Sequence, residues 1–209
     1  METNSQVDTL ADQAFELEQE GRVAEAMGCY DQLLALPEVA GVFRGKVLYN
    51  KGLALYTLLR HEEAVGCFRE ALAAPGIPDE QRAWTLMNLG VTLDELGSSQ
   101  EAIDAYRQIA ALPGATTDQK AKALANQAMT LTELERPEEV LRCHEQVLAL
   151  PGLSSGYTAE TLLVMAQVLY QLERDPEAIA CCERILAMSD LPPAMHDFAR
   201  KQRAVILAS

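Results

Sequence analysis

Apolar side chains recur along this chain at helical spacing, and the pattern itself returns with a period of 38. In the clearest stretch, one helix face holds Leu86, Leu89, Leu93 and Leu96. Shifting the sequence by 38 positions aligns two sets of leucines, namely Leu10, Leu48, Leu86, Leu124 and Leu162, and Leu17, Leu55, Leu93, Leu131 and Leu169. A period of this length, held through five copies, predicts a solenoid of stacked repeats rather than one compact core.

Each copy is predicted to form two helices joined by a short turn. A second apolar stripe follows the first after a brief break, such as Glu20-Gly21-Arg22, and so short a break joins antiparallel helices. Small residues recur where the two helices should cross closely, and an aromatic side chain, at Tyr30, Phe68 and Tyr106, should fill the space between copies. A proline closes most copies, at Pro37, Pro75, Pro113 and Pro151, and Ser189 replaces it in the last.

The copies predict a single domain over residues 1–209 that belongs to the all-α class. Its five antiparallel hairpins should occupy residues 7–40, 45–78, 83–116, 121–154 and 159–190, and a C-terminal helix at 194–207 should cap the array. The chain should curve into a right-handed α-solenoid whose first helices line the inner, concave face. Composition agrees, because 49% of residues are hydrophobic and only 5% are aromatic, with few strand formers.

The repeat resembles the tetratricopeptide repeat. The third copy carries the resemblance through Asn-Leu-Gly at 88–90, Leu93, Ala102, Tyr106 and Pro113, and the second through Tyr49-Asn50-Lys51-Gly52 and Glu62-Glu63-Ala64-Val65. It covers residues 7 to about 189, with a period of 38 against the 34 usual in that family. We expect the extra residues in the loops 37–43, 75–81, 113–119 and 151–157. Copies four and five depart from the pattern at Val140, His144 and Cys182, which puts the tightness of packing there in question.

Charge excludes several classes of partner. The net charge is −14 and the pI is about 4.6, which is the wrong sign for binding nucleic acid or an anionic membrane. No signal peptide and no run of eighteen apolar residues is visible, so we predict a soluble, cytoplasmic protein. Residues 1–40 hold nine acids and one base, so the first copy either attracts a basic partner or forms a solvated end cap.

Asparagine recurs at one position of the first helix in three successive copies. Asn50, Asn88 and Asn126 are spaced by one period and should form a row across the inner face. An asparagine amide offers two donors and an acceptor, which suits it to binding the backbone of an extended peptide. In tetratricopeptide proteins that hold peptides, asparagines at this position have that role, so the resemblance implies peptide binding. The alternative is that each amide bonds a neighbouring helix.

Five further residues share the predicted groove. Lys46 and Lys122 lie one helical turn before Asn50 and Asn126, on the same face, where they could bind carboxylates. Tyr49, Trp84 and Met87 could grip an apolar side chain, although Trp84 could equally pack between copies. The family's clamp for C-terminal acidic tails is not expected, because Tyr49, Leu53 and Asn126 stand where its pattern has other residues.

No pattern predicts catalysis, a metal or a cofactor. Four cysteines, Cys29, Cys67, Cys143 and Cys181, occupy one repeat position, so they should be small buried hydrophobes rather than a metal site. The three histidines are scattered, and no phosphate-binding loop, nucleophile elbow or metal signature is present.

The sequence therefore predicts a non-catalytic scaffold that binds an extended peptide of a partner protein in its concave groove. Two alternatives stay open. The chain could self-associate, forming a homo-oligomer through the apolar end of its C-terminal helix, Val205 to Leu207. It could also be a regulatory segment of a larger enzyme or sensor.

Overall fold

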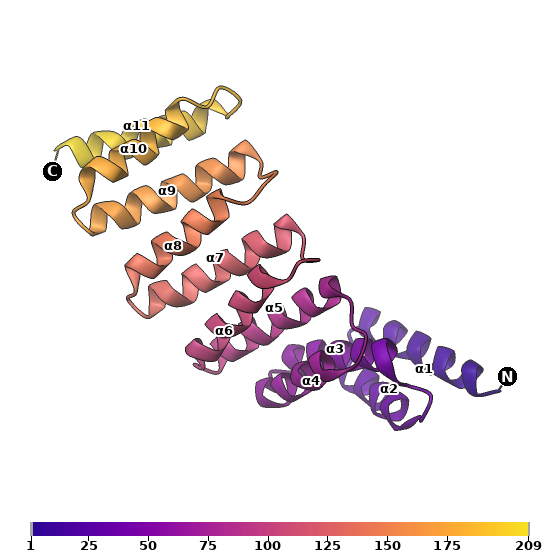
Figure 1. The fold of residues 1–209 in the computed structure, drawn as a ribbon. Coiled ribbons are helices and arrows are strands. Elements are labelled where there is room, and N and C mark those ends of the chain that lie inside the picture. The colour runs from indigo at the N-terminus through magenta and orange to yellow at the C-terminus, as the bar shows by residue number, and fades with distance from the viewer. Residues whose placement is uncertain (1, 209) are drawn as a thin grey trace. The chain divides into compact units, whose positions relative to one another are not determined.

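The structure is a computed structural model that describes residues 2–208, which form eleven α-helices and no strand (Figure 1). The helices are α1 (Glu2–Gln19), α2 (Val23–Ala35), α3 (Gly41–Thr57), α4 (His61–Ala73), α5 (Asp79–Glu95), α6 (Ser99–Ala111), α7 (Thr117–Glu133), α8 (Pro137–Leu148), α9 (Ser155–Gln171), α10 (Asp175–Leu186) and α11 (Pro193–Ala208). The predicted all-α class, its helical hairpins and the additional C-terminal helix are confirmed.

The helices divide between two compact units, Met1–Thr116 and Thr117–Ser209. In the first unit, α1 pairs with α2, α3 with α4 and α5 with α6, while α2 packs on α3 and α4 on α5. In the second, α7 pairs with α8 and α9 with α10, α8 packs on α9, and α11 covers α10. Each unit is thus a stack of hairpins in sequence order. That the whole chain forms one domain stays a prediction.

The loops between copies lie where they were predicted but end earlier, since residues 41–43, 79–81, 117–119 and 155–157 already belong to the first helices. The helices α3, α5, α7 and α9 are each 17 residues long and begin about one turn earlier than expected. Local chemistry explains the extension. In α5, Pro78 precedes the helix, and Asp79 and Glu80 place negative charge in its first turn, where the helix dipole favours it. In α9, the Ser154 hydroxyl caps the helix by accepting a hydrogen bond from the Tyr157 amide.

The turn inside each hairpin repeats one backbone geometry. The residue that ends the turn has a positive φ in all five hairpins, and these residues are spaced by one period, at Gly21, Leu59, Gly97, Glu135 and Glu173. The next amide then bonds back into the last turn of the first helix, as from Arg60 N to Leu55 O at 2.9 Å. Only two of the five are glycines, so the turn is imposed by packing of the helices as much as by glycine's freedom.

Small residues do mark the close helix crossings, as predicted. A Cβ added to Gly52 would lie 2.6 Å from the ring of Phe68, and one added to Gly90 would lie 2.4 Å from the ring of Tyr106. Both rings are buried, with Phe68 at 0% and Tyr106 at 1% exposure. In these two hairpins, the ring occupies the space that a side chain on the first helix would otherwise fill.

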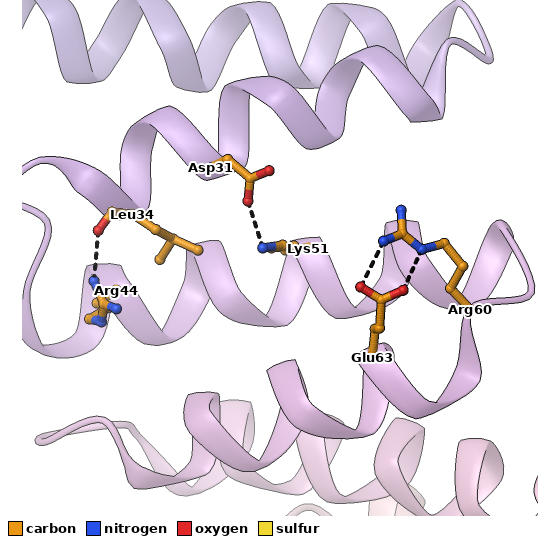
Figure 2. A network of polar contacts seen from close by, with 6 residues as sticks. All are labelled: Asp31, Leu34, Arg44, Lys51, Arg60 and Glu63. Carbon is orange, nitrogen blue, oxygen red and sulfur yellow. Dashed lines mark hydrogen bonds and ion pairs between the residues drawn. The ribbon is translucent and has the colours of Figure 1, made fainter.

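Polar contacts join successive hairpins in the first unit (Figure 2). The guanidinium of Arg44 in α3 donates to the carbonyl oxygen of Leu34 in α2 at 3.0 Å, and so satisfies an acceptor near the end of that helix. Nearby, Lys51 pairs with Asp31 at 2.6 Å. Burial lowers the pKa of Lys51, but the hydrogen bond and charge of Asp31 outweigh it, so the pKa is raised overall. These contacts hold α3 against α2 and so fix the helix that carries the candidate site.

The C-terminal helix α11 packs only one of its faces. Ala199 and Ile206 are 0% and 3% exposed and belong to the core formed with α9 and α10. Of the three terminal apolar residues that the sequence left open, Ile206 is therefore packed, whereas Val205 and Leu207 are exposed. Phe198 is exposed as well.

Candidate functional site

A pocket of about 420 Å³ lies between α3 and α5 in the first unit. Its walls contain four of the eight residues predicted to bind peptide, Lys46, Tyr49, Asn50 and Trp84, together with Pro78, Glu80 and Gln81. Tyr49 and Trp84 come from helices one repeat apart, and stacking of the hairpins brings their aromatic rings to one place. Three predicted residues of α3 and one of α5 therefore line a single pocket.

Helix α3 presents a polar edge and an aromatic wall. Lys46 and Asn50 are one turn apart, and both are exposed. Neither forms a hydrogen bond or ion pair with any described residue, so both side chains are available to a ligand. Tyr49 is half-buried, and its ring packs at 6.1 Å, centroid to centroid, against Phe68 of α4. The ring is thereby fixed in the pocket by the core beneath it.

Asn88 of α5 is bonded to the aromatic wall that α3 contributes. Its amide nitrogen donates to the Tyr49 hydroxyl at 3.0 Å and to the Trp84 carbonyl oxygen at 3.0 Å. Both amide hydrogens are thus used within the protein, and only the side-chain oxygen is left for a ligand. Burial raises the pKa of Tyr49, while the bond from Asn88 opposes that shift. The amide of Asn88 therefore bonds a neighbouring helix, α3, which was the alternative to peptide binding. Its role in the site is to orient Tyr49.

Met87 does not line the groove. Its side chain is only 7% exposed and belongs to the core of α5. Helical spacing places Met87 beside Trp84 and Asn88, but α5 packs against α3, α4 and α6, and Met87 is among its buried residues. The expectation that Met87 grips a ligand is therefore wrong.

Lys122 and Asn126 lie on α7 of the second unit. Lys122 is exposed and pairs with Asp118 at 2.9 Å, one turn earlier on the same helix. Asn126 is partly buried and has a polar partner within the protein. Because these two residues belong to a different unit from Asn50 and Asn88, a continuous row of three asparagines stays a prediction.

The pocket contains residues that sequence reasoning did not single out. Glu80 and Gln81 lie four and three positions before Trp84, so helical spacing alone places them on the same face. Glu80 contributes a carboxylate opposite in sign to Lys46. The amide of Gln81 is buried, and neither its oxygen nor its nitrogen has a hydrogen-bond partner in the protein. An unpaired buried amide has no sequence signature.

The described residues offer no metal centre and no membrane span. In residues 2–208, no three His, Cys, Asp or Glu side chains gather as metal ligands. The cysteines are free thiols, with Cys29, Cys143, Cys181 and Cys182 buried and Cys67 half-buried, as expected of small core residues. None of the described helices is both long and apolar enough to cross a membrane.

Comparison with protein families agrees with the geometry of the hairpins. The sequence model named "Tetratricopeptide repeat" matches residues 43–113, and a second, named "Tetratrico peptide repeat", matches residues 83–206, which is more than half of the chain. The chain belongs to the tetratricopeptide repeat family. Tetratricopeptide repeat proteins bind other proteins or peptides and are generally not catalysts.

Solved structures of other tetratricopeptide repeat proteins have the same fold. MamA superposes with a TM-score of 0.67 at 14% identity, covering 90% of this chain and 100% of MamA. A protein of "Podosopora anserina" described as a kinesin light chain with TPR-like repeats gives 0.65 at 18% identity, covering 100% of both chains. YrrB, described as a TPR protein with an unusual peptide-binding site, gives 0.61 at 18% identity, covering 92% of this chain and 90% of YrrB. No curated protein matches this tetratricopeptide repeat protein significantly.

Proposed function

We propose that this tetratricopeptide repeat protein is a non-catalytic interaction module that binds an extended peptide segment of a partner protein. The observation that carries the proposal is the pocket between α3 and α5, which gathers Lys46, Tyr49, Asn50 and Trp84. Family membership supports it, because proteins of this family bind proteins or peptides. YrrB, which shares the fold, is itself described as having a peptide-binding site.

Four side chains of the pocket have a role in this proposal. The exposed amide of Asn50 bonds the peptide backbone, since it can donate and accept at once. Lys46 attracts a carboxylate of the ligand, and the rings of Tyr49 and Trp84 hold an apolar side chain. Asn88 holds the Tyr49 ring in place through the hydroxyl of that residue.

The second unit repeats part of this arrangement. Lys122 and Asn126 lie two periods after Lys46 and Asn50. We propose that they make equivalent contacts with a peptide bound to the second unit itself, for which Lys122 must release Asp118. Exposed ion pairs of this kind contribute little, so that exchange costs little.

Peptides selected on the intact protein test the proposal. A library of random twelve-residue peptides displayed on phage is panned against the full chain, and selected peptides are measured by isothermal titration calorimetry. We expect Lys46→Ala combined with Asn50→Ala to weaken binding at least roughly tenfold, because it removes the polar contacts of the pocket. Lys201→Ala is the matched control, since it removes an exposed lysine on α11 outside the pocket.

Two results would overturn this function. One is that no peptide is selected. The other is that selected peptides bind the double variant as tightly as the parent while circular dichroism shows both to be folded.

A cytoplasmic location stays a prediction.

A second candidate function is self-association through α11. It is favoured by the exposure of Phe198, Val205 and Leu207, at 59%, 59% and 62%. By helical spacing, Phe198 and Val205 lie on one flank of the buried face that Ala199 and Ile206 mark, and Leu207 lies on the opposite flank. Light scattering of the intact chain separates the two candidates, because a chain that remains monomeric at high concentration excludes self-association.

A further inference from the structure

The amide of Gln81 is the least satisfied polar group in the pocket. Its oxygen and its nitrogen are both buried, and neither has a hydrogen-bond partner among the described residues. Leaving a buried donor and a buried acceptor unpaired costs free energy, so native proteins seldom retain such a group without a reason. Gln81 also lines the pocket between α3 and α5, so a ligand there would lie beside it.

The equivalent residue in the next copy is different. Gln119 lies one period after Gln81, at the same position of its first helix. It is 2% exposed and has a polar partner within the protein. A glutamine at this repeat position can therefore be satisfied internally, and the unpaired state of Gln81 is particular to the copy that contains the pocket.

The other walls of the pocket select for a neutral, planar group. Tyr49, Trp84 and Pro78 give flat apolar surfaces on which a planar group can stack. Lys46 and Glu80 contribute one charge of each sign, so a charged ligand side chain attracted by one is repelled by the other. A neutral side chain avoids that repulsion.

We propose that this pocket recognises a carboxamide side chain, glutamine or asparagine, of the bound peptide, and that Gln81 reads it. Two primary amides pair head to head, each donating one N–H to the other's oxygen, so a carboxamide satisfies both unpaired atoms of Gln81. A carboxylate can pair only with its nitrogen, an ammonium or guanidinium only with its oxygen, and an aliphatic side chain with neither. Both atoms are covered in the structure, so pairing requires Gln81 to change rotamer about the torsions of its aliphatic part, which turns the amide into the pocket.

This inference rests on the proposed peptide binding and adds the chemistry of one side chain of the ligand. Its test uses the peptides selected on the intact chain. We expect glutamine or asparagine to be enriched at one position of those peptides. Replacing that residue by glutamate, lysine or leucine should weaken binding by roughly tenfold or more, because a site built to bond an amide rejects analogues that lack it.

Two variants of Gln81 attribute the preference to its amide. Gln81→Met keeps the length of the side chain and removes both polar atoms, so the variant should bind the glutamine and leucine peptides equally. Gln81→Glu removes the donor and adds charge, so it should shift the preference from glutamine toward lysine. Gln119→Met is the matched control at the equivalent position and should leave the preference unchanged.

The outcomes distinguish a failure of carboxamide recognition from a failure of the proposed peptide binding. If peptides bind and the change of Lys46 and Asn50 to alanine abolishes binding, but no amide preference exists or Gln81→Met retains it, carboxamide recognition is wrong and the peptide site stands. If no peptide is selected, or the selected peptides ignore the pocket variants, both proposals fail.

Discussion

Two hairpins of the first unit and two of the second reach the same helix crossing with different side chains. In the first unit, Gly52 lies against Phe68 and Gly90 against Tyr106, with no room for a Cβ on either glycine. The equivalent pairs in the second unit are Ala128 with His144 and Ala166 with Cys182. Val140 and Cys182, which depart from the family pattern, are nevertheless 2% and 0% exposed.

The comparison shows that what matters at the crossing is the combined volume of the two facing side chains, one from each helix, and not their identity. Protein interiors are close-packed, so a large ring on the second helix favours a first helix without a Cβ, as at Gly52 and Gly90, whereas a smaller side chain permits alanine. The first hairpin combines Ala14 with Tyr30, which shows that the exchange is not strict.

Removing a ring of the first unit should have the largest effect. Phe68→Ala should lower the free energy of unfolding by about 3–5 kcal/mol, since it leaves a cavity beside Gly52, which has no side chain to fill it. Cys182→Ala, at the equivalent position, should cost only about 1 kcal/mol. Urea unfolding followed by circular dichroism measures both. Equal losses in the two variants would contradict the idea of a combined volume.

Adding a methyl group should have a smaller effect. In Gly90→Ala the new Cβ would meet the ring of Tyr106, and overpacking typically costs about 1–3 kcal/mol, more than the roughly 1 kcal/mol that alanine gains over glycine in a helix. We expect a net loss of about 1 kcal/mol, seen as a lower melting temperature. The reverse change, Ala166→Gly, should also destabilise its helix. An unchanged melting temperature for Gly90→Ala would mean that Tyr106 adjusts, as Tyr30 does beside Ala14.

The smallest effect should be on how the free energy of unfolding depends on pH. Only the second unit has a histidine, His144, where the first unit has the rings of Phe68 and Tyr106. Burial lowers the pKa of His144 below its usual 6.5. The unfolded chain then binds a proton more readily than the folded one, so the contribution of His144 to stability is fully present above pH 6.5 and is lost as the pH falls toward the folded pKa. His144→Phe should flatten this part of the curve of unfolding free energy against pH. A curve that the substitution leaves unchanged would exclude His144 as its cause.

Much of the fold is readable from the sequence because each structural requirement recurs five times. Leucines, small residues and turn residues at one spacing reinforce one another, and they fix the hairpins more firmly than any single copy could. The helix starts were misplaced because nothing between residues 79 and 82 breaks a helix, while the expectation followed the shorter family repeat.

The site was less readable because its details depend on contacts between copies. Lys46, Asn50 and Trp84 were found because exposure on a helix follows from periodicity. The bond from Asn88 to Tyr49 joins two separate helices, and it depends on how two hairpins stack. The burial of Met87 depends on the same stacking, and the unpaired amide of Gln81 depends on atomic positions that no pattern of residue types encodes.

Trp84 gives the pocket an optical property of its own. It is the single tryptophan of the chain, and it is 36% exposed in the pocket wall. Any tryptophan emission from this protein therefore originates at that wall. A group that displaces water from the indole should shift the emission to shorter wavelength, so the site can report its own occupancy without a label. The same signal follows the unfolding of α5 separately from that of the second unit.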